Sequence, residues 1–400
     1  MSKVGFLEKL LDGAEVEWKK LGDVAEIKRG TPITKKNVVP GDVPVLAGGR
    51  TPAYYHNVSN REGQTIVIAG SGAYAGFVSW WEEPIFVSDA FTVKPTSTLI
   101  AKYCYHFLIN MQQQLHKFKS GGGVPHVYPR DVSPIKIPIP CPNNPEKSLA
   151  IQAEIVRILD TFTELTTELT TELNARKKQY NYYRDRLLNF KEGEVEWKTL
   201  GEVSLKSYSG GTPKAGNSTY YEGGTIPWLR TQEVVFSDIH ETAIKITQAA
   251  LDETAAKWIP ENCVIIAISG ATAGRSGINK IPLTTNQHCC CLEIDPEQAR
   301  YRYVFHWVSM NYEKLKDMGQ GARGDLNSGI IKGFKIPIPF ARDPRRSLAE
   351  QARIVSILDK FDTLTNSISE GLPREIELRQ KQYEYYRDLL LSFPKPKATS

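Results

Sequence analysis

Apolar side chains recur every three or four positions along residues 148–190, with polar side chains between them. This spacing is typical of a helix that buries one stripe in a coiled coil. The sequence therefore predicts one long helix here, roughly 65 Å in length at 1.5 Å per residue. The stripe consists of Ile151, Ile155, Ile158, Phe162, Leu165, Leu169, Leu173, Tyr180, Tyr183, Leu187 and Phe190.

The same pattern returns near the C-terminus. Residues 347–361 repeat residues 148–162, and residues 379–393 repeat residues 176–190, with four additional residues between the blocks of the second copy. A four-residue insertion keeps an apolar stripe on one side of a helix, so we expect a second continuous helix. Ser148 and Ser347 are suitable N-cap residues. The second stripe consists of Ile354, Ile357, Phe361, Leu364, Ile368, Leu372, Ile376, Tyr383, Tyr386, Leu390 and Phe393.

Each of these helices must bury its stripe. The obvious partner is the other copy, which predicts a paired, rod-like coiled coil; an ordinary bundle core is the alternative. Part of the repeat also occurs near the N-terminus, where residues 9–24 resemble residues 186–203. Residues 1–14 thus look like the tail of a helix. We expect them to pack near the C-terminal helix and close a pseudo-two-fold ring.

Two globular segments alternate with the helices. Short β-branched and aromatic runs bounded by Gly and Pro predict strands, and residues 101–118 and 298–318 each predict one helix. Shared motifs align the segments: residues 30–32 with 211–213, 65–76 with 264–274, and 136–140 with 335–339. The expected class is α+β. The expected organisation is an N-terminal segment 1–14, a first domain 15–147, a central helix 148–193, a second domain 194–346, a C-terminal helix 347–393 and a tail 394–400.

Between these shared motifs the two segments diverge. Residues 35–39 have no counterpart in residues 215–219, and residues 119–128 differ from residues 319–327. The chain thus repeats its scaffold but varies its surface loops, where function commonly lies.

Composition and charge bear on the binding partners and the cellular location of the protein. The formal net charge of +5 is compatible with nucleic-acid binding but is weak support alone. The six cysteines lack zinc-site spacing, and Cys289, Cys290 and Cys291 are expected to fill a buried strand in a reducing cytosol. The N-terminus has no apolar signal core, and no run of about 18 apolar residues could span a membrane.

The repeated blocks support a family resemblance. The Leu-Asp-Thr-Phe and Leu-Asp-Lys-Phe motifs, the Lys-Gln-Tyr-x-Tyr-Tyr-Arg-Asp motifs, the three Thr-Glu-Leu tetrads of residues 163–174 and the two unlike globular segments form one pattern. It resembles the specificity subunit of type I restriction–modification systems, most closely the subclass with tetrad repeats in the central helix. The resemblance covers essentially the whole chain.

This resemblance implies a function without catalysis. Each globular segment would be a target-recognition domain that reads one half of an asymmetric, bipartite double-stranded DNA target. The helices would form an antiparallel coiled coil that sets the spacer and docks two methyltransferase subunits, which restriction and translocase subunits join. S-adenosylmethionine, ATP and Mg²⁺ would belong to those partners, with no cofactor or metal in this chain. The expected location is the cytoplasm of a bacterium or archaeon.

The geometry of a duplicated chain agrees with this picture. Two similar bodies on pseudo-two-fold helices would place two readers on the order of 34 Å apart, about one turn of DNA. Each tetrad adds roughly 6 Å of helix, enough to change the spacer by a base pair or two.

A search for catalytic motifs supports the same conclusion. The sequence has neither the Asn-Pro-Pro-aromatic signature of an amino-methyltransferase nor a Gly-Lys-Ser/Thr phosphate loop. Residues 70–76 hint at a nucleotide loop, but their repeat loses the first glycine, so a tight turn between strands is expected. Asp23, Glu26 and Lys28 resemble a nuclease metal site, but the second segment does not repeat it and the spacing of Asp23 is poor, so no nuclease site is expected there.

DNA contacts must then come from basic, amide and aromatic side chains on the variable loops. Arginine usually reads guanine, whereas asparagine and glutamine read adenine. For any single residue, a solvated surface role remains an open alternative. The candidates in the first segment are Lys28, Arg29, Lys35, Lys36, Arg50, Tyr54, Tyr55, His56, His126, Tyr128 and Arg130. Those in the second are Lys214, Asn217, Arg230, Gln232, Arg275, Asn286, Gln287, His288 and Arg323.

The aromatic and leucine positions of the stripes are candidates for helix pairing and for docking of partner subunits. These are Phe162, Leu165, Leu169, Tyr180, Tyr183, Phe361, Leu364, Tyr383 and Tyr386. Two other functions stay open: a self-contained nuclease or methyltransferase, and a coiled-coil adaptor whose two heads bind protein or sugar. Salt-dependent binding to duplex DNA would separate a DNA reader from the adaptor.

Overall fold

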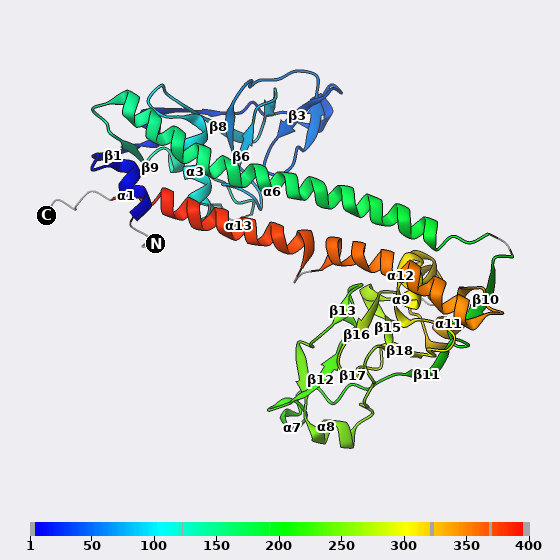
Figure 1. Ribbon diagram of the computed structural model, residues 1–400. Coiled ribbons are helices and arrows are strands. Elements are labelled where there is room, and N and C mark those ends of the chain that lie inside the picture. Colours follow the sequence, from blue (N-terminus) through cyan, green and yellow to red (C-terminus); the bar gives the residue numbers. More distant parts are fainter. Residues whose placement is uncertain (1–4, 122, 192, 321–323, 368–369, 395–400) are drawn as a thin grey trace. The chain divides into compact units, whose positions relative to one another are not determined.

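The computed structural model describes residues 5–121, 123–191, 193–320, 324–367 and 370–394. The chain divides into two compact units, the first formed by residues 1–168 and 377–400 and the second by residues 169–376. Each unit has its own sheets, its own core and its own share of the long helices (Figure 1). The class is α+β, as the strand and helix patterns predicted.

The first unit contains three small sheets. A four-stranded antiparallel sheet has the order β2-β8-β5-β6, a three-stranded sheet the order β4-β3-β7, and β1 pairs with β9 from Val16↔Pro140 to Lys20↔Lys136. The strands are β1 (Val16–Lys20), β2 (Ala25–Arg29), β3 (Val43–Leu46), β4 (Tyr54–His56), β5 (Thr65–Ala69), β6 (Val78–Trp81), β7 (Phe86–Val87), β8 (Ala90–Pro95) and β9 (Lys136–Pro140).

Helices enclose the core of this unit. They are α1 (Gly5–Leu11), α2 (Leu21–Val24), α3 (Ala101–Asn110), α4 (Gln112–Lys117), α5 (Pro129–Val132) and the 3₁₀ turn η1 (Lys35–Asn37). The long helix α6 (Pro145–Leu187) begins here, and most of α13 (Gly371–Leu390) belongs here. Buried side chains of β5, β8, α3, α6 and α13 share one apolar cluster, so the globular part and the helix pair have a common core.

The second unit repeats this plan with an extra strand. Its main sheet has the order β11-β18-β15-β16-β13, its three-stranded sheet the order β14-β12-β17, and β10 pairs with β19. The strands are β10 (Val195–Thr199), β11 (Ser204–Tyr208), β12 (Ile226–Leu229), β13 (Asp238–Ile239), β14 (Ile244–Ile246), β15 (Val264–Ala267), β16 (Ser276–Asn279), β17 (Thr284–Thr285), β18 (Cys289–Ile294) and β19 (Lys335–Pro339).

The helices of the second unit are again short apart from α6 and α12. They are α7 (Ser218–Tyr221), α8 (Gln248–Glu253), α9 (Tyr301–Met310), α10 (Tyr312–Asp317), α11 (Ser328–Gly333), α12 (Pro344–Asn366), η2 (Thr231–Glu233) and η3 (Gly270–Thr272). The three consecutive cysteines lie in β18 and are fully buried, as predicted. Nowhere in the described ranges is a helix both long and apolar enough to cross a membrane.

The long helices begin earlier than predicted. Asn144 Oδ1 accepts a hydrogen bond from Lys147 N at 3.0 Å, and Asp343 Oδ1 accepts one from Arg346 N at 3.1 Å. Helices α6 and α12 therefore start at Pro145 and Pro344. The prediction that Ser148 and Ser347 are N-caps is wrong, because both are buried inside the helices.

The prediction of one continuous C-terminal helix is also wrong, because it is interrupted between α12 and α13. Gly371 has φ +77°, and a Cβ there would lie 2.4 Å from the Thr363 carbonyl oxygen, so only glycine fits the break. Pro373 falls in the first turn of α13, where proline is tolerated, whereas a helix interior excludes it. The four additional residues of the second copy thus accompany a break instead of a stutter.

The expected helices 101–118 and 298–318 are each divided in two. Met111 separates α3 from α4 with φ −89° and ψ 6°, and Asn311 separates α9 from α10 with φ −96° and ψ 22°. The buried Asn311 amide donates to the Trp307 carbonyl at 2.9 Å, which holds the bend. Because both breaks occur at the same place in the repeat, they belong to the duplicated scaffold.

The N-terminal helix α1 packs where the sequence repeat predicted. Helix α1 lies beside the end of α13 (Figure 1). Leu7 and Leu11 are buried in the same cluster as Leu390, Leu391 and Phe393. The Trp18 indole also donates to the Pro394 carbonyl at 2.8 Å. The first strand of the chain is thereby tied to its last described residue.

Candidate nucleic-acid interface

Three loops of the first unit hold one another in place: the β3–β4 turn, the β5–β6 turn and the segment between α4 and α5. Gly72 N donates to Pro125 O at 2.9 Å, which joins the second loop to the third. A Cβ on Gly48 would lie 2.3 Å from Ser71 O, so the first loop needs glycine to approach the second. The loops therefore form one surface; we call residues 47–53, 70–77, 118–121 and 123–130 the loop platform.

The second unit builds the same backbone arrangement. Three backbone hydrogen bonds of the first unit have equivalents in the second, and all six are 2.8–3.1 Å long. Gly70 N donates to Asp89 O, as Ile268 N does to His288 O. Val127 N donates to Gly70 O, as Leu326 N does to Ile268 O, and Gly76 N donates to Ala69 O, as Gly274 N does to Ala267 O. The shared motifs at residues 65–76 and 264–274 therefore form the same backbone hydrogen bonds. As predicted, residues 70–76 form a turn between strands.

The side chains on this common scheme differ in chemistry. Asp89 occupies the place of His288, and His126 occupies the place of Asp325. An acid and an imidazole have thus exchanged positions between the units. A carboxylate only accepts hydrogen bonds, whereas an imidazole can donate. The two loop surfaces therefore differ in their hydrogen-bonding groups.

Arg50 contacts two aromatic rings of a neighbouring loop. Its guanidinium carbon lies 4.7 Å from the centroid of the Tyr74 ring and 5.5 Å from that of Phe77. Both rings belong to the β5–β6 turn, so cation–π contacts hold Arg50 across two loops.

A second aromatic cluster surrounds Tyr128. The His126 ring stacks on it at 5.7 Å and 14° between planes. The guanidinium carbon of Arg130 lies 4.6 Å from the Tyr128 centroid, and that of Arg29 lies 6.0 Å away. These four predicted residues therefore meet, and Lys28 precedes Arg29 as an exposed residue of β2.

The remaining candidates of the first unit lie near η1 and β4. Lys35, Lys36 and Tyr55 are exposed and Tyr54 is half-buried. His56 is buried, and its Nδ1 lies 3.0–3.1 Å from both backbone polar atoms of Val39. This placement gives His56 a role in holding the η1 loop and argues against a direct base contact.

In the second unit, Gln287 and His288 form an exposed polar pair. Thr212 Oγ1 donates to Gln287 Oε1 at 2.5 Å, and Gln287 Nε2 lies 3.2 Å from His288 Nε2. Asn286 is buried, and its Oδ1 accepts from His288 N at 3.0 Å, so it supports the pair from below. Arg275 is half-buried and lies directly before β16, at the end of the β15–β16 turn.

The other candidates of this unit are more dispersed. Lys214 and Gln232 are exposed, and Asn217 caps α7 by accepting from Thr219 N at 3.2 Å. The Nε of Arg230 donates to Glu233 at 3.3 Å, so its charge is partly satisfied within the unit. Arg323 lies outside the described residues.

Aromatic pairs join the long helices inside each unit. Phe162 of α6 stacks on Tyr386 of α13 in the first unit, with centroids 5.1 Å apart. Phe361 of α12 stacks on Tyr183 of α6 in the second, at 5.5 Å. In each unit α6 runs antiparallel to its partner (Figure 1). The other pairing candidates, Leu165, Leu169 and Leu364, are half-buried.

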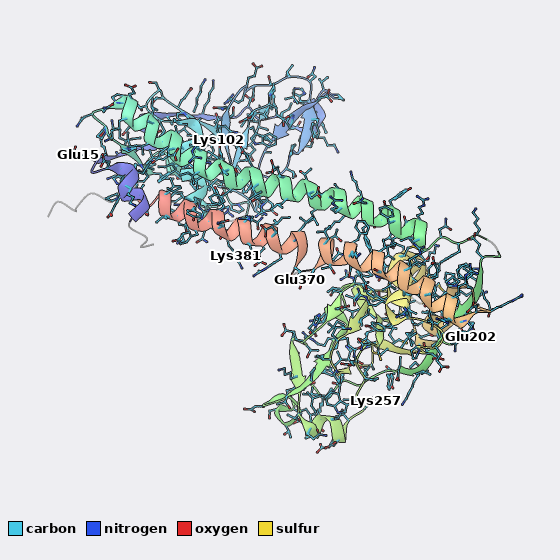
Figure 2. The ribbon with its side chains drawn as sticks, in the orientation of Figure 1. Glu15, Lys102, Glu202, Lys257, Glu370 and Lys381 are labelled. Carbon is cyan, nitrogen blue, oxygen red and sulfur yellow. The ribbon has the colours of Figure 1, made fainter. Side chains whose placement is uncertain are left out.

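A polar cluster that the sequence did not predict ties the first globular part to its helices. His106 of α3 is buried; its Nε2 lies 2.7 Å from Asp160 Oδ1 on α6, and its Nδ1 lies 3.1 Å from the Tyr383 hydroxyl on α13. Lys102, labelled in Figure 2, approaches the same carboxylate at 4.0 Å. Burial opposes ionisation of Asp160, but the hydrogen bond and charge of His106 and the charge of Lys102 outweigh it, so the pKa of Asp160 is lowered.

The second unit repeats this cluster with a stronger cation. His306 Nε2 lies 2.7 Å from Asp359 Oδ1, and its Nδ1 lies 3.5 Å from the Tyr180 hydroxyl. Arg302 donates to Asp359 at 2.7 Å and to Asp238 at 2.6 Å. Burial opposes ionisation of Asp359, but bonds from His306 and Arg302 lower its pKa below the usual value.

Two buried glutamines complete these contacts between each globular part and its long helices, which we call the junctions. Gln152 Oε1 accepts from Ile100 N at 2.9 Å, and Gln351 Oε1 accepts from Arg300 N at 2.9 Å. Each glutamine thereby caps the helix that carries His106 or His306. The signal for them was present, because the glutamine and the aspartate recur at the same places in both copies of the repeated block.

No cluster of three or more His, Cys, Asp or Glu side chains suited to a metal ion occurs among the residues the structure describes.

Comparison with known proteins agrees with this architecture. A family model for the type I restriction modification DNA specificity domain matches residues 14–178 and again residues 192–378. The chain is 42% identical over 420 residues to the specificity subunit of the Escherichia coli type I restriction enzyme EcoR124I/EcoR124II, covering all of both chains. It is 33% identical over 409 residues to a putative type I restriction enzyme specificity subunit of Haemophilus influenzae, covering 97% of this chain and 98% of the relative.

A solved structure shares the fold. The crystal structure of a type I restriction–modification S subunit from M. genitalium matches with a TM-score of 0.66 at 16% identity, covering 96% of this chain and 98% of that one. The family model covers both repeats, and full-length relatives exceed 30% identity. The chain therefore belongs to the family of type I restriction–modification DNA specificity subunits.

Proposed function

We propose that this DNA-recognition subunit reads a bipartite DNA target, one half with each of its two units. One observation carries the proposal: the same backbone hydrogen bonds present Asp89 and His126 in the first unit but His288 and Asp325 in the second. The same scaffold lets both units approach a DNA duplex in the same way, while their different side chains select different base sequences. The target would therefore be asymmetric.

The helices would set the spacer between the half-sites. Helix α6 is continuous over 43 residues and contains the three tetrads of residues 163–174. A continuous helix has a length fixed by its residue count, at roughly 1.5 Å per residue. The tetrads would thus act as a ruler whose number selects the non-specific gap.

Docking of two methyltransferase subunits would use the outer face of the helix pair. Tyr182 and Tyr385 occupy equivalent positions in the repeat and are 58% and 49% exposed, although their neighbours Tyr183 and Tyr386 pack on phenylalanines. Exposed tyrosines are common interface anchors. Restriction subunits would join through the methyltransferases, and S-adenosylmethionine, ATP and Mg²⁺ would bind to these partners.

The decisive experiment is methylome sequencing of a host that carries this chain with its methyltransferase. Replacing residues 15–147 by the corresponding segment of a relative should change one half-site only, and replacing residues 194–346 should change the other. A replacement that alters both halves, or neither, would contradict the assignment of one half-site to each unit.

Two further measurements address the other functions. The purified chain alone, given metal ions and S-adenosylmethionine, should neither cleave nor methylate DNA. Duplex binding should strengthen when the methyltransferase is added, and should weaken steeply with salt as phosphate contacts require. Salt-independent binding to protein or sugar would instead support an adaptor.

A further inference from the structure

We propose that Arg50 reads a guanine in the half-site bound by the first unit, an inference that rests on the proposed function. Arg50 is exposed on the β3–β4 turn of the loop platform. A guanidinium can donate two parallel hydrogen bonds to O6 and N7 of guanine in the major groove. The case for this residue comes from its backbone, its ring contacts and its lack of internal partners.

The backbone beside Arg50 is held against the neighbouring loop. Gly48 approaches Ser71 so closely that a Cβ would lie 2.3 Å from Ser71 O and 2.9 Å from its Oγ. Ser71 is itself fixed, because its hydroxyl donates to the Asp89 carboxylate. A reading side chain must start from such a fixed point if it is to reach one base edge reproducibly.

The guanidinium is also restrained. Its carbon lies 4.7 Å from the Tyr74 centroid and 5.5 Å from the Phe77 centroid. A planar guanidinium stacks on aromatic faces while its N–H groups remain free at the edge. The side-chain entropy lost on binding DNA is then smaller, because part of the ordering has already occurred.

Internal partners distinguish Arg50 from other cations of this unit. Arg61 donates to Thr92, to Asn60 O and to Arg29 O. The Nε atom of Arg130 lies 3.9 Å from Oδ1 of Asp131. Within the described residues, no hydrogen bond or carboxylate contact engages the Arg50 guanidinium, so its donors are available to a base.

A phosphate contact by Arg50 is the competing role, and Arg50→Lys separates the two. Lysine keeps the charge that a phosphate needs but lacks the rigid planar fork with which arginine fixes two parallel hydrogen bonds to guanine. The measurement is methylation by the complete complex of a duplex set in which each base pair of the target is replaced in turn. We expect Arg50→Lys to relax selectivity at a single G·C pair of one half-site by roughly 10- to 100-fold.

Tyr74→Leu should relax the same pair more weakly, since Tyr74 is a positioning residue that only restrains the guanidinium. Arg157→Lys, an exposed change on α6 in a residue that bonds Glu154, should behave as the wild type. If Arg50→Lys keeps full selectivity while Arg50→Ala weakens all sequences equally and lowers the salt dependence, Arg50 binds phosphate and the inference is overturned. Unchanged behaviour of both Arg50 variants also overturns it.

Methylation by the wild-type complex distinguishes a failure of the proposed function from a failure of the inference about Arg50. A wild type that methylates no bipartite sequence contradicts the proposed function. A bipartite pattern in which the Arg50 variants alter no base pair, or alter one other than G·C, contradicts only the role of Arg50.

Discussion

The ring of Phe162 lies nearly parallel to that of Tyr386, with centroids 5.1 Å apart and 15° between the planes. The same contact occurs between Phe361 and Tyr183, at 5.5 Å and 22°. In each pair the phenylalanine comes from one copy of the repeated block and the tyrosine from the other. The duplicated helices therefore pack on each other, once in each unit.

Truncation of either phenylalanine should destabilise its own unit. Removing a half-buried ring from this contact is expected to cost about 2 kcal/mol, through lost apolar burial and lost aromatic pairing. Phe162→Ala and Phe361→Ala should each lower a thermal transition of the purified complex, whereas Phe162→Leu should lower it less. Equal transitions for Phe162→Ala and the wild type would show that the stacked pair does not stabilise the helices.

The ion pairs of the second junction predict a stability difference between two equivalent aspartates. Both aspartates bond a histidine at 2.7 Å, but Asp359 also bonds Arg302 at 2.7 Å, whereas Lys102 approaches Asp160 only at 4.0 Å. Asp359→Asn should therefore cost about 1–3 kcal/mol, discounted for the 34% exposure of the carboxylate, and Asp160→Asn should cost less. Chemical denaturation at pH 7 of the two variants compares these costs directly.

The pH dependence of that loss follows from the lowered pKa of Asp359. A carboxyl with a depressed folded-state pKa contributes stability that is present above its unfolded-state pKa, about 3.9, and is lost as pH falls through the folded-state value. The wild type should thus lose more stability than Asp359→Asn on acidification below about pH 4. Parallel losses in both proteins would contradict this linkage.

Shortening α6 by one tetrad should change only the spacer. Deleting residues 167–170 removes roughly 6 Å of helix and about 400° of rotation, which leaves the apolar stripe near its original side. Methylome sequencing should therefore find the same two half-sites separated by a gap shorter by one or two base pairs. Altered half-sites with an unchanged gap would contradict the ruler.

The consecutive cysteines of β18 should resist alkylation in the native protein. Burial raises the pKa of Cys289 to about 12 and that of Cys290 to about 11, so little reactive thiolate exists at pH 8. Iodoacetamide treatment followed by mass spectrometry should find both unmodified in the folded chain and modified after unfolding in denaturant. Rapid labelling of the folded chain would place them at the surface.

The sequence alone determined the repeated plan of this protein. Stripes such as Ile151 to Phe190 predicted the long helices because a helix that must bury one face needs apolar residues at its own period. Duplication of the block predicted that the copies would pair, and the shared glycine motifs located the β5–β6 and β15–β16 turns. These features depend on local spacing, which a linear chain records directly.

Tertiary structure decided where the helices break and which side chains meet. The C-terminal helix is interrupted before Gly371, where the Thr363 carbonyl lies too close for any side chain, a contact that spacing does not reveal. His106 and Asp160 lie far apart in the sequence and meet only because α3 packs on α6. Likewise, Arg50 and Tyr74 belong to separate loops, and only the close approach of Gly48 to Ser71 brings the guanidinium over the ring.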